Sequence, residues 1–367
     1  MDAQITPVSL QYVPGDVRRY GARGDGSTND SPAIQQAIDA STYGSQKRIY
    51  IPATLPGYRI SSTINVSGAV SICGDSKFNT LLLPASDIPV FSLSDGDSDV
   101  TISDLQIFGT GSASNTQPAI LFTNNQYCVL ERLYITRCGW GVRFAPGSVA
   151  SYENEIHSCK INSNIVGNID AGTNTNLLYL YNVQFGSAPF GVRIRDSMGL
   201  QIYGGDCEGC TTAGVDIDST IGALPVNAII SGVDFEGNRT SGGNIRIGAS
   251  GTIRGVTVVG CYFQPGPGDA YAINPLNCDS LTVVGCTQVG GYTAAVWINL
   301  SGNLTNLTTI GCRDSTGLGT THKAGVGFAG IAAPAAVAGH AVVFLDSADG
   351  TLKVTFPNGT VRTLASP

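Results

Sequence analysis

Two short segments of the sequence resemble each other and are rich in carboxylates: GGDCEG at 204–209 and GVDFEG at 232–237. Together they contribute Asp206, Glu208, Asp234 and Glu236. In each segment the acidic residues alternate around an apolar one, Cys207 or Phe235, which is the pattern of a strand with one buried face. We therefore expect the four carboxylates to point outward from two neighbouring strands.

Four carboxylates on one surface repel one another, so the pKa of at least one of them is expected to rise. A protonated carboxyl beside an ionised one is the acid–base pair that glycoside hydrolysis requires. Residues two apart on a strand are separated by ~6.5–7 Å, and residues on adjacent strands by ~4.8 Å. Carboxyl separations of ~6.5–9.5 Å suit inversion and ~5–5.5 Å suit retention, so a pair along one strand favours inversion. The alternatives are a non-catalytic sugar or cation site, or a solvated acidic face.

A second set of charged and aromatic residues is expected to flank the carboxylates as substrate contacts. These are Arg193, Arg195, Asp216, Asp218, Arg246, Tyr262 and Trp297. Arginines beside carboxylates orient sugar hydroxyls or bind an acidic sugar, and the two aromatic rings are candidate platforms for stacking. The charged residues fit structural ion pairs between strands equally well. A lyase is the competing mechanism, because the arginines could supply its base and the cation that neutralises a uronate carboxyl.

The segments that carry these residues belong to a repeat that begins near residue 100. Nine similar segments recur at intervals of 22 to 28 residues, about 26 on average, and a second apolar run follows most of them. Their shared central position falls at Leu105, Leu133, Cys159, Val183, Gly205, Val233, Cys261, Cys286 and Cys312. A repeat of this period made only of strands predicts a parallel β-helix, whose coils stack ~4.8 Å apart.

The same alignment accounts for several of the ten cysteines. Four of them occupy the shared position, where other coils carry leucine or valine, so we expect a stack of small buried hydrophobic side chains. A metal site or a disulfide is the alternative. The cysteines do not include the two C-x2-C pairs of a zinc ribbon.

The amino-acid composition restricts which kinds of molecule the protein is expected to bind. Charged residues make up 13% of the chain, there are 47 glycines, and the net charge is −7. A negative chain is not expected to bind nucleic acid, and no apolar run reaches the ~18 residues that a membrane span needs. The N-terminus lacks a basic region followed by an apolar one, so we expect no signal peptide and synthesis in a cytoplasm.

Residues 20–40 read YGARGDGSTNDSPAIQQAIDA. Ser31 as the N-cap and Pro32 at the first helical position predict a short helix over 31–41. This stretch closely resembles the opening motif of the pectate-lyase-like superfamily of right-handed parallel β-helix proteins, and the strands expected at 48–52, 58–60 and 70–72 follow it as in that family. With the coils, the resemblance covers residues 15–316.

In that family the opening motif is structural. Its helix covers the N-terminal end of the solenoid, Gly24 and Gly26 form a tight turn, and Asp25 and Asp30 accept hydrogen bonds from backbone amides. Calcium is an alternative for these two aspartates, but the twelve-residue calcium loop that ends in glutamate is absent. We therefore expect no cofactor and no metal.

The resemblance implies a function as well as an all-β fold. The family contains polysaccharide lyases, hydrolases and epimerases, and phage tailspikes that are usually homotrimers. The phage branch implies a homotrimer in a virion tail that binds, and hydrolyses, a bacterial surface polysaccharide. The alternatives are a non-catalytic receptor-binding or structural tail protein, and a lyase or epimerase in a bacterial cytoplasm or exported without a signal peptide.

Three regions are expected along the chain. Residues 1–45 form an N-terminal lead and capping helix, and residues 46–316 form the β-helix. Residues 317–367 form a C-terminal module of three strands joined by hairpin turns at Asp349-Gly350 and Asn358-Gly359. This module is expected to serve as a cap or as a trimerisation element.

Overall fold

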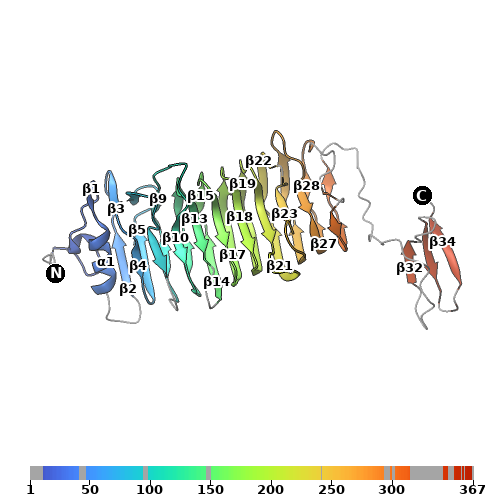
Figure 1. The fold of residues 1–367 in the computed structure, drawn as a ribbon, viewed down its shortest axis with the longest axis horizontal. Coiled ribbons are helices and arrows are strands. Elements are labelled where there is room, and N and C mark those ends of the chain that lie inside the picture. Colours follow the sequence, from blue (N-terminus) through green and yellow to red (C-terminus); the bar gives the residue numbers. More distant parts are fainter. Residues whose placement is uncertain are drawn as a thin grey trace.

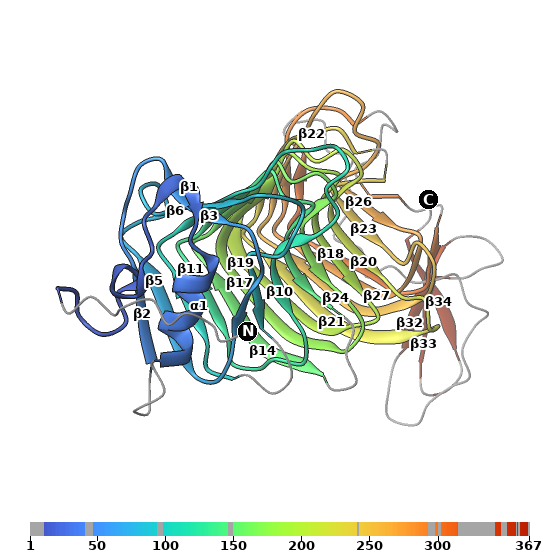
Figure 2. The same cartoon turned by 60° about the vertical axis from the view of Figure 1, so that its left-hand side comes forward.

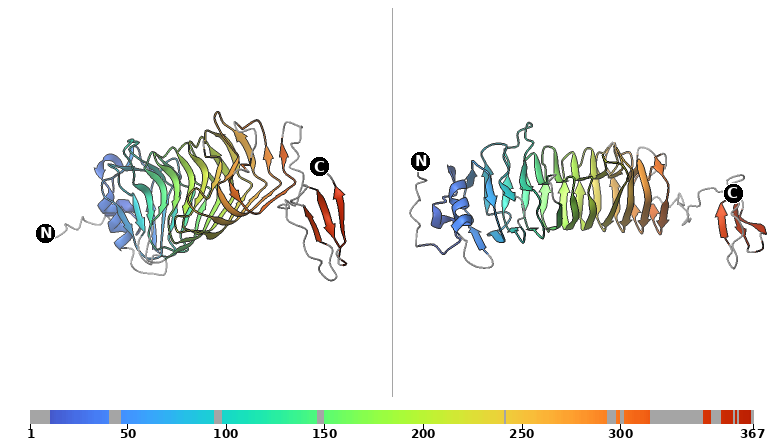
Figure 3. Two further views of the ribbon diagram at one scale, coloured as in Figure 1. Left: turned by 45° about the vertical axis from the view of Figure 1, so that its right-hand side comes forward. Right: turned by 60° about the horizontal axis from the view of Figure 1, so that its bottom comes forward.

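The computed structural model shows a right-handed parallel β-helix whose coils stack along one long axis (Figure 1). It describes residues 11–40, 47–93, 98–145, 150–240, 242–292, 298–299, 302–314, 342–345, 351–356, 358 and 360–365. The solenoid predicted from the repeat is therefore confirmed. The coils build three faces, and corresponding strands of successive coils pair in parallel (Figure 3).

The first face contains the longest strands. In chain order they are β2 (Lys47–Ile51), β5 (Val70–Gly74), β8 (Thr101–Ser103), β11 (Val129–Glu131), β14 (Ser151–His157), β17 (Thr175–Gly186), β19 (Met198–Glu208), β21 (Leu224–Ser231), β24 (Ile253–Val259), β27 (Asn277–Val284), β29 (Asn303–Leu304) and β30 (Leu307–Ile310). Strands β17 and β19 bend and continue into the second face.

The second face carries the carboxylates. Besides the ends of β17 and β19, it contains β1 (Asp25–Asn29), β3 (Gly57–Ile60), β6 (Leu81–Pro84), β9 (Gln106–Phe108), β12 (Tyr134–Thr136), β15 (Lys160–Asn162), β22 (Asp234–Asn238), β25 (Tyr262–Pro265), β28 (Thr287–Gln288) and β31 (Arg313–Asp314).

The third face is a separate parallel sheet. Its described strands are β4 (Ile64–Val66), β7 (Phe91–Leu93), β10 (Pro118–Phe122), β13 (Trp140–Phe144), β16 (Gly167–Ala171), β18 (Phe190–Arg195), β20 (Ala213–Asp218), β23 (Ile245–Ile247) and β26 (Ile273–Pro275).

The core is a set of columns, because register places equivalent inward side chains on top of one another. From β2 to β27 the members of the central column of the first face are at most 1% exposed: Ile49, Ile72, Ile102, Leu130, Ile156, Leu180, Ile202, Ile230, Val258 and Val283. On the second face Phe235 and Phe263 stack with ring centroids 5.1 Å apart. Such burial supplies the main favourable free energy of folding.

Three of the four cysteines at the shared repeat position are buried as predicted, and the fourth, Cys312, is partly buried. Cys159, Cys261 and Cys286 are at most 2% exposed, and Cys159 accepts a hydrogen bond from the Leu133 amide at 3.3 Å. Burial raises the pKa of the Cys159 thiol to about 12. Cys207 lies with its sulfur 3.8 Å from that of another buried thiol three residues further on, Cys210. These thiols are packing residues of the core.

A short helix crosses the N-terminal end of the solenoid (Figure 2). Helix α1 (Ser31–Ala40) follows the 3-10 helix η1 (Val17–Tyr20), and its apolar face, with Ile34 and Ile38, is completely buried. The helix is confirmed, but its N-cap position is Asp30 and not Ser31. The Ser31 hydroxyl instead accepts the Ser61 amide at 2.9 Å, which ties the helix to the first coil.

The turn before α1 also has the predicted geometry. Asp25 accepts the amides of Ser27 and Thr28 at 2.9 and 2.7 Å, and Asp30 accepts those of Arg23 and Gly24 at 2.7 and 3.2 Å. The hydrogen bonds that Asp25 accepts from these amides lower its pKa. Burial raises the pKa of Asp30, although the hydrogen bonds that it accepts from backbone amides act in the opposite direction.

The C-terminal strands form a three-stranded antiparallel sheet of β32 (Val342–Leu345), β33 (Leu352–Thr355) and β34 (Val361–Ala365), as predicted. Most of the predicted turn residues, and the expected boundaries near 45 and 316, lie outside the described residues. Within the described ranges, no helix combines the length and apolar character that a membrane span requires.

Candidate functional site

The four carboxylates lie together on the outer side of the second face. Asp206 is the register partner of Asp234, and Glu208 is the partner of Glu236. The residues between them, Cys207 and Phe235, are fully buried. The predicted outward orientation is therefore confirmed, and the positions of β19 and β22 in the solenoid can be followed in Figure 1.

Among the four carboxylates, Asp234 has a distinct environment. Its Oδ1 atom is buried and has no hydrogen-bond partner within the described part of the chain. Its pKa is raised, first by burial and then by the charges of Glu236 and Asp206. This is the rise in a carboxyl pKa that the clustering predicts. A carboxyl whose pKa is raised holds its proton to a higher pH than an ordinary aspartic acid and is available as a general acid.

Neutral side chains orient the surrounding carboxylates. Gln184 donates from Nε2 to Asp206 Oδ2 at 2.9 Å, and Gln264 donates from Nε2 to Glu236 Oε1 at 3.2 Å. Tyr262 is the register partner of Asp234 on the next coil and donates its hydroxyl to Gln264 Oε1 at 3.1 Å. The predicted place of Tyr262 beside the carboxylates is confirmed.

The predicted arginine contacts lie on the third face, in a column where arginine and aspartate alternate. Arg193 pairs with Asp170 at 2.9 Å, and Arg246 donates two hydrogen bonds, at 2.7 and 2.8 Å, to the completely buried Asp216. The guanidinium of Arg193 also covers the Trp140 ring at 4.3 Å. This geometry matches the structural alternative, ion pairs between coils.

The remaining predicted contacts have separate positions. Asp218 accepts the Ser250 amide and hydroxyl at 2.7 and 2.8 Å and so fixes the following turn. Arg195 is exposed beside Asp218 in register. Trp297 lies outside the described residues. The described residues contain no group of three or more His, Cys, Asp and Glu arranged to hold a metal ion.

The sequence analysis did not identify a row of aromatic side chains on the first face. Tyr181 and Tyr203 are register partners on β17 and β19, with ring centroids 5.5 Å apart and planes inclined by 12°. His157 lies 4.7 Å from Tyr181 on the other side, and its Nε2 is 2.6 Å from Glu155 Oε2. The alternation in NLLYLYN and LQIYGG, set in the repeat alignment, contains the signal that would have revealed this row.

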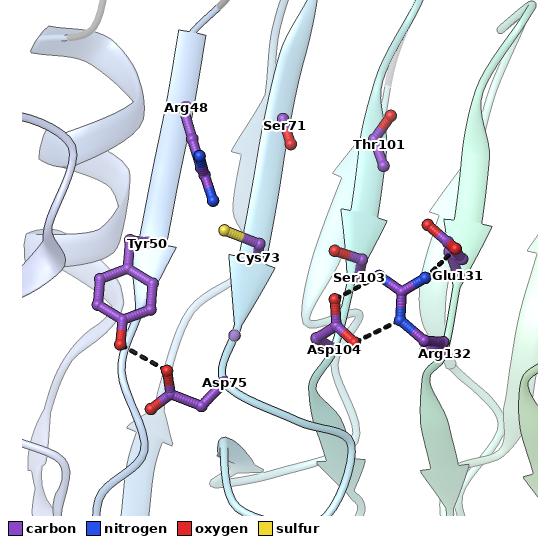
Figure 4. Close-up of a pocket in the computed structure, with 11 residues that line it drawn as sticks. Arg48, Tyr50, Ser71, Cys73, Asp75, Thr101, Ser103, Asp104, Glu131 and Arg132 are labelled. Atoms are coloured by element: carbon purple, nitrogen blue, oxygen red, sulfur yellow. Dashed lines mark hydrogen bonds and ion pairs between the residues drawn. The ribbon is translucent and has the colours of Figure 1, made fainter.

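Two hollows are arranged along the first face. One, of about 500 Å³, is lined by Tyr127, Val129, Glu153, Glu155, Tyr179 and Tyr181. The other, of about 730 Å³, lies over β2, β5, β8 and β11, nearer the N-terminus (Figure 4). In it Tyr50 donates to Asp75 at 2.5 Å, and Arg132 pairs with Asp104 and Glu131. Most charged groups of this larger hollow already bind one another.

Comparison with known proteins agrees with the fold. Residues 16–100 match the family model described as rhamnogalacturonase A/epimerase, pectate lyase-like. No curated protein matches the chain by sequence.

Solved β-helix structures resemble the chain at low sequence identity. The A-module of the mannuronan C-5 epimerase AlgE4 from Azotobacter vinelandii is 14% identical with a TM-score of 0.59, covering 82% of this chain and 95% of that one. PfbA, a surface adhesin of Streptococcus pneumoniae, is 15% identical with a TM-score of 0.58, covering 96% and 100%. The tailspike of Acinetobacter baumannii phage AM24 is 17% identical with a TM-score of 0.52, covering 83% and 54%. These similarities concern the fold.

Proposed function

We propose that this parallel β-helix, of which residues 16–100 match a pectate-lyase-like family model, binds a bacterial surface polysaccharide and hydrolyses it at the carboxylate cluster. The main support for hydrolysis is the environment of the Asp234 carboxyl. Its carboxyl has a buried oxygen without a hydrogen-bond partner in the described structure, a raised pKa, and carboxylate neighbours along its own strand and on the adjacent coil.

In the proposed reaction Asp234 donates its proton to the glycosidic oxygen as the bond to the leaving sugar breaks. Glu236, two residues along β22, takes a proton from the attacking water. A spacing of two residues along a strand is ~6.5–7 Å, which leaves room for that water and favours inversion at the anomeric carbon. Burial and the charge of Glu236 raise the pKa of Asp234, the charge of Asp206 adds to the rise, and Gln264 orients Glu236.

Hydrolysis is favoured over a lyase reaction by the placement of the cations. A lyase must neutralise the carboxyl of a uronate next to the base that removes its α-proton. Arg193 and Arg246 are paired with aspartates on a different face from the cluster. The cluster itself is acidic and repels a polyuronate.

The test is the release of reducing ends from a panel of purified capsular and O-antigen polysaccharides. Hydrolysis is expected to generate new reducing ends without unsaturated uronates, and proton NMR of the first products is expected to show the inverted anomer. Products that absorb in the ultraviolet as unsaturated uronates would establish a lyase instead. Binding without any cleavage would leave the receptor-binding alternative, which the aromatic row on the first face favours.

We also propose that the protein is a homotrimer in a phage tail. The support is the sequence FLDSADGTLKVTFPNGTVRTL at 344–364, which resembles short terminal segments of phage tail proteins, and the likeness of the fold to a tailspike structure. Sedimentation equilibrium of the full chain is expected to give three times the 38.0 kDa chain mass. A monomeric mass would contradict the trimer and leave the proposed hydrolysis to be judged by its own assay.

A further inference from the structure

The aromatic row on the first face ends in an accessible ring. Tyr179, Tyr181 and Tyr203 form what we call the tyrosine strip; Tyr179 and Tyr181 lie 6.0 Å apart with nearly parallel planes. On the coil after Tyr203, the register partner is Ser231. A serine is too small to cover a phenol ring, and Tyr203 is 38% exposed. The last ring of the strip therefore offers a face to an external partner.

The electrostatics of the strip restrict that partner. The hollow beside it is lined by Glu153 and Glu155 and by no cationic side chain. The charge of Glu153 raises the pKa of Tyr127 at the rim, and Glu155 already contacts His157. Aromatic faces with carboxylates between them suit a ligand that has apolar ring faces and hydroxyl or ammonium donors. They repel a ligand that carries carboxylates of its own.

The strip is also connected to the carboxylate cluster. Tyr203 and Asp206 lie on the same strand, β19, three residues apart, so their Cα atoms are separated by at most ~11 Å. Between them the chain turns the corner from the first to the second face at Gly204, and the next coil turns at Gly232. The corner of earlier coils carries side chains instead, from Asp104, Arg132, Ser158 and Asn182. Between Tyr203 and Asp234, therefore, the corner positions of these two coils are glycines and carry no side chain.

From this arrangement we propose that the tyrosine strip is a saccharide subsite for neutral or amino sugars, in which Tyr203 stacks on a sugar close to the bond cleaved at Asp234. The inference deepens the proposed function and rests on it only for the position of that bond. The polysaccharide crosses the corner at Gly204, so that one part lies on the first face and the next part on the second. Polyuronates are excluded by the carboxylates on both sides.

The test separates binding from cleavage. Asp234→Asn is used as the parent so that no substrate is consumed, and binding is measured on an array of bacterial polysaccharides that contains neutral, amino-sugar and uronate-rich members. We expect the parent to bind neutral or amino-sugar members, and Tyr203→Ala to weaken that binding at least tenfold, ~1.4 kcal/mol. Tyr203→Phe retains the ring and is expected to bind within threefold of the parent.

Tyr12→Ala is the control, because Tyr12 is a partly exposed tyrosine that lies before η1, where its ring packs against Arg18 and not on the first or second face. It is expected to leave binding unchanged. Thermal unfolding of each variant confirms that it is folded. The inference is overturned if the parent binds none of the polysaccharides, if it binds only uronate-rich ones, or if Tyr203→Ala binds like the parent. Strip-dependent binding without any cleavage by the wild-type protein would instead contradict the proposed hydrolysis and leave the subsite standing.

Discussion

Asp206 and Asp234 are direct register partners on adjacent coils, and both side chains lie on the outside of the solenoid. A parallel β-helix brings them together although 28 residues separate them in the sequence, because one coil of the repeat has that length. Like charges directly opposite on neighbouring strands are destabilising, by roughly 0.2–1 kcal/mol. Burial first, and then the charges of Glu236 and Asp206, raise the pKa of Asp234, so the repulsion contributes to the property that a general acid needs.

Replacement of the acid is expected to abolish most turnover. Asp234→Asn keeps the shape of the side chain but has no proton of suitable acidity to donate, and loss of a general acid lowers the rate by ~10²–10⁴-fold. Glu236→Gln is expected to have an effect of the same order, because it removes the base. The measurement is the initial rate of reducing-end release. Asp39→Asn, an exposed carboxylate on α1, serves as the control and is expected to keep the wild-type rate.

The raised pKa of Asp234 gives activity and stability a defined dependence on pH. Activity is expected to fall as the pH rises through the pKa of Asp234, because the protonated acid is lost. When folding raises the pKa of a carboxyl, binding of its proton stabilises the folded state. This stabilisation is complete below the pKa of the unfolded chain, ~3.9, and is lost as the pH rises through the pKa of the folded state. Asp234→Asn is therefore expected to unfold at a higher temperature than wild type at pH 7, with little difference near pH 3. A lower melting temperature at pH 7 would contradict the repulsion argument.

The pair between Asp216 and Arg246 is expected to stabilise the fold. Asp216 is completely buried and accepts two hydrogen bonds from this arginine. Asp216→Ala leaves the guanidinium without that partner, which should cost about 3–5 kcal/mol in the free energy of unfolding. Urea denaturation measures the change. A variant with wild-type stability but lost polysaccharide affinity would show that these residues are substrate contacts, as the sequence analysis proposed.

Two glycines form a matched pair: Gly24 in the turn before the capping helix, and Gly68 in the turn between β4 and β5. Gly24 has φ of +62°, and a Cβ there would lie 2.1 Å from Thr54 Oγ1. Gly68 has φ of +70°, with nothing within 4 Å of such a Cβ. Alanine at either position incurs the left-handed backbone cost of roughly 1–2 kcal/mol, but only Gly24→Ala adds a steric clash. Gly24→Ala is expected to lower the melting temperature clearly more than Gly68→Ala, and equal shifts would argue against a tight cap.

Periodicity made most of the fold predictable. Stacking forces equivalent residues of each coil into one column, so the alignment alone places Cys207 and Phe235 inside and their acidic neighbours outside. The helix over 31–41 was predictable for a local reason, since proline at its start and apolar residues at helical spacing suffice. Only its cap differs, because the Ser31 hydroxyl has a tertiary partner in Ser61 that the local sequence does not reveal.

Side-chain pairing on the outer faces was less predictable. A column of arginine and aspartate has the same sequence pattern whether the charges pair with one another or await a ligand, and only burial separates the two cases. The tyrosine strip was missed for a different reason. Its residues belong to the first face, while the carboxylates that attracted attention belong to the second, and the bend at Gly204 that joins them is a three-dimensional feature.

One experiment distinguishes a polysaccharide hydrolase in which Asp234 is the acid from a protein that only binds the polysaccharide. Wild-type protein and Asp234→Asn are incubated with the polysaccharide that wild type binds best, and reducing ends are counted over time. We expect steady release by wild type and at least a hundredfold slower release by Asp234→Asn, with unchanged binding. Equal release by the two proteins, or none by wild type, would contradict the role of Asp234 as the acid.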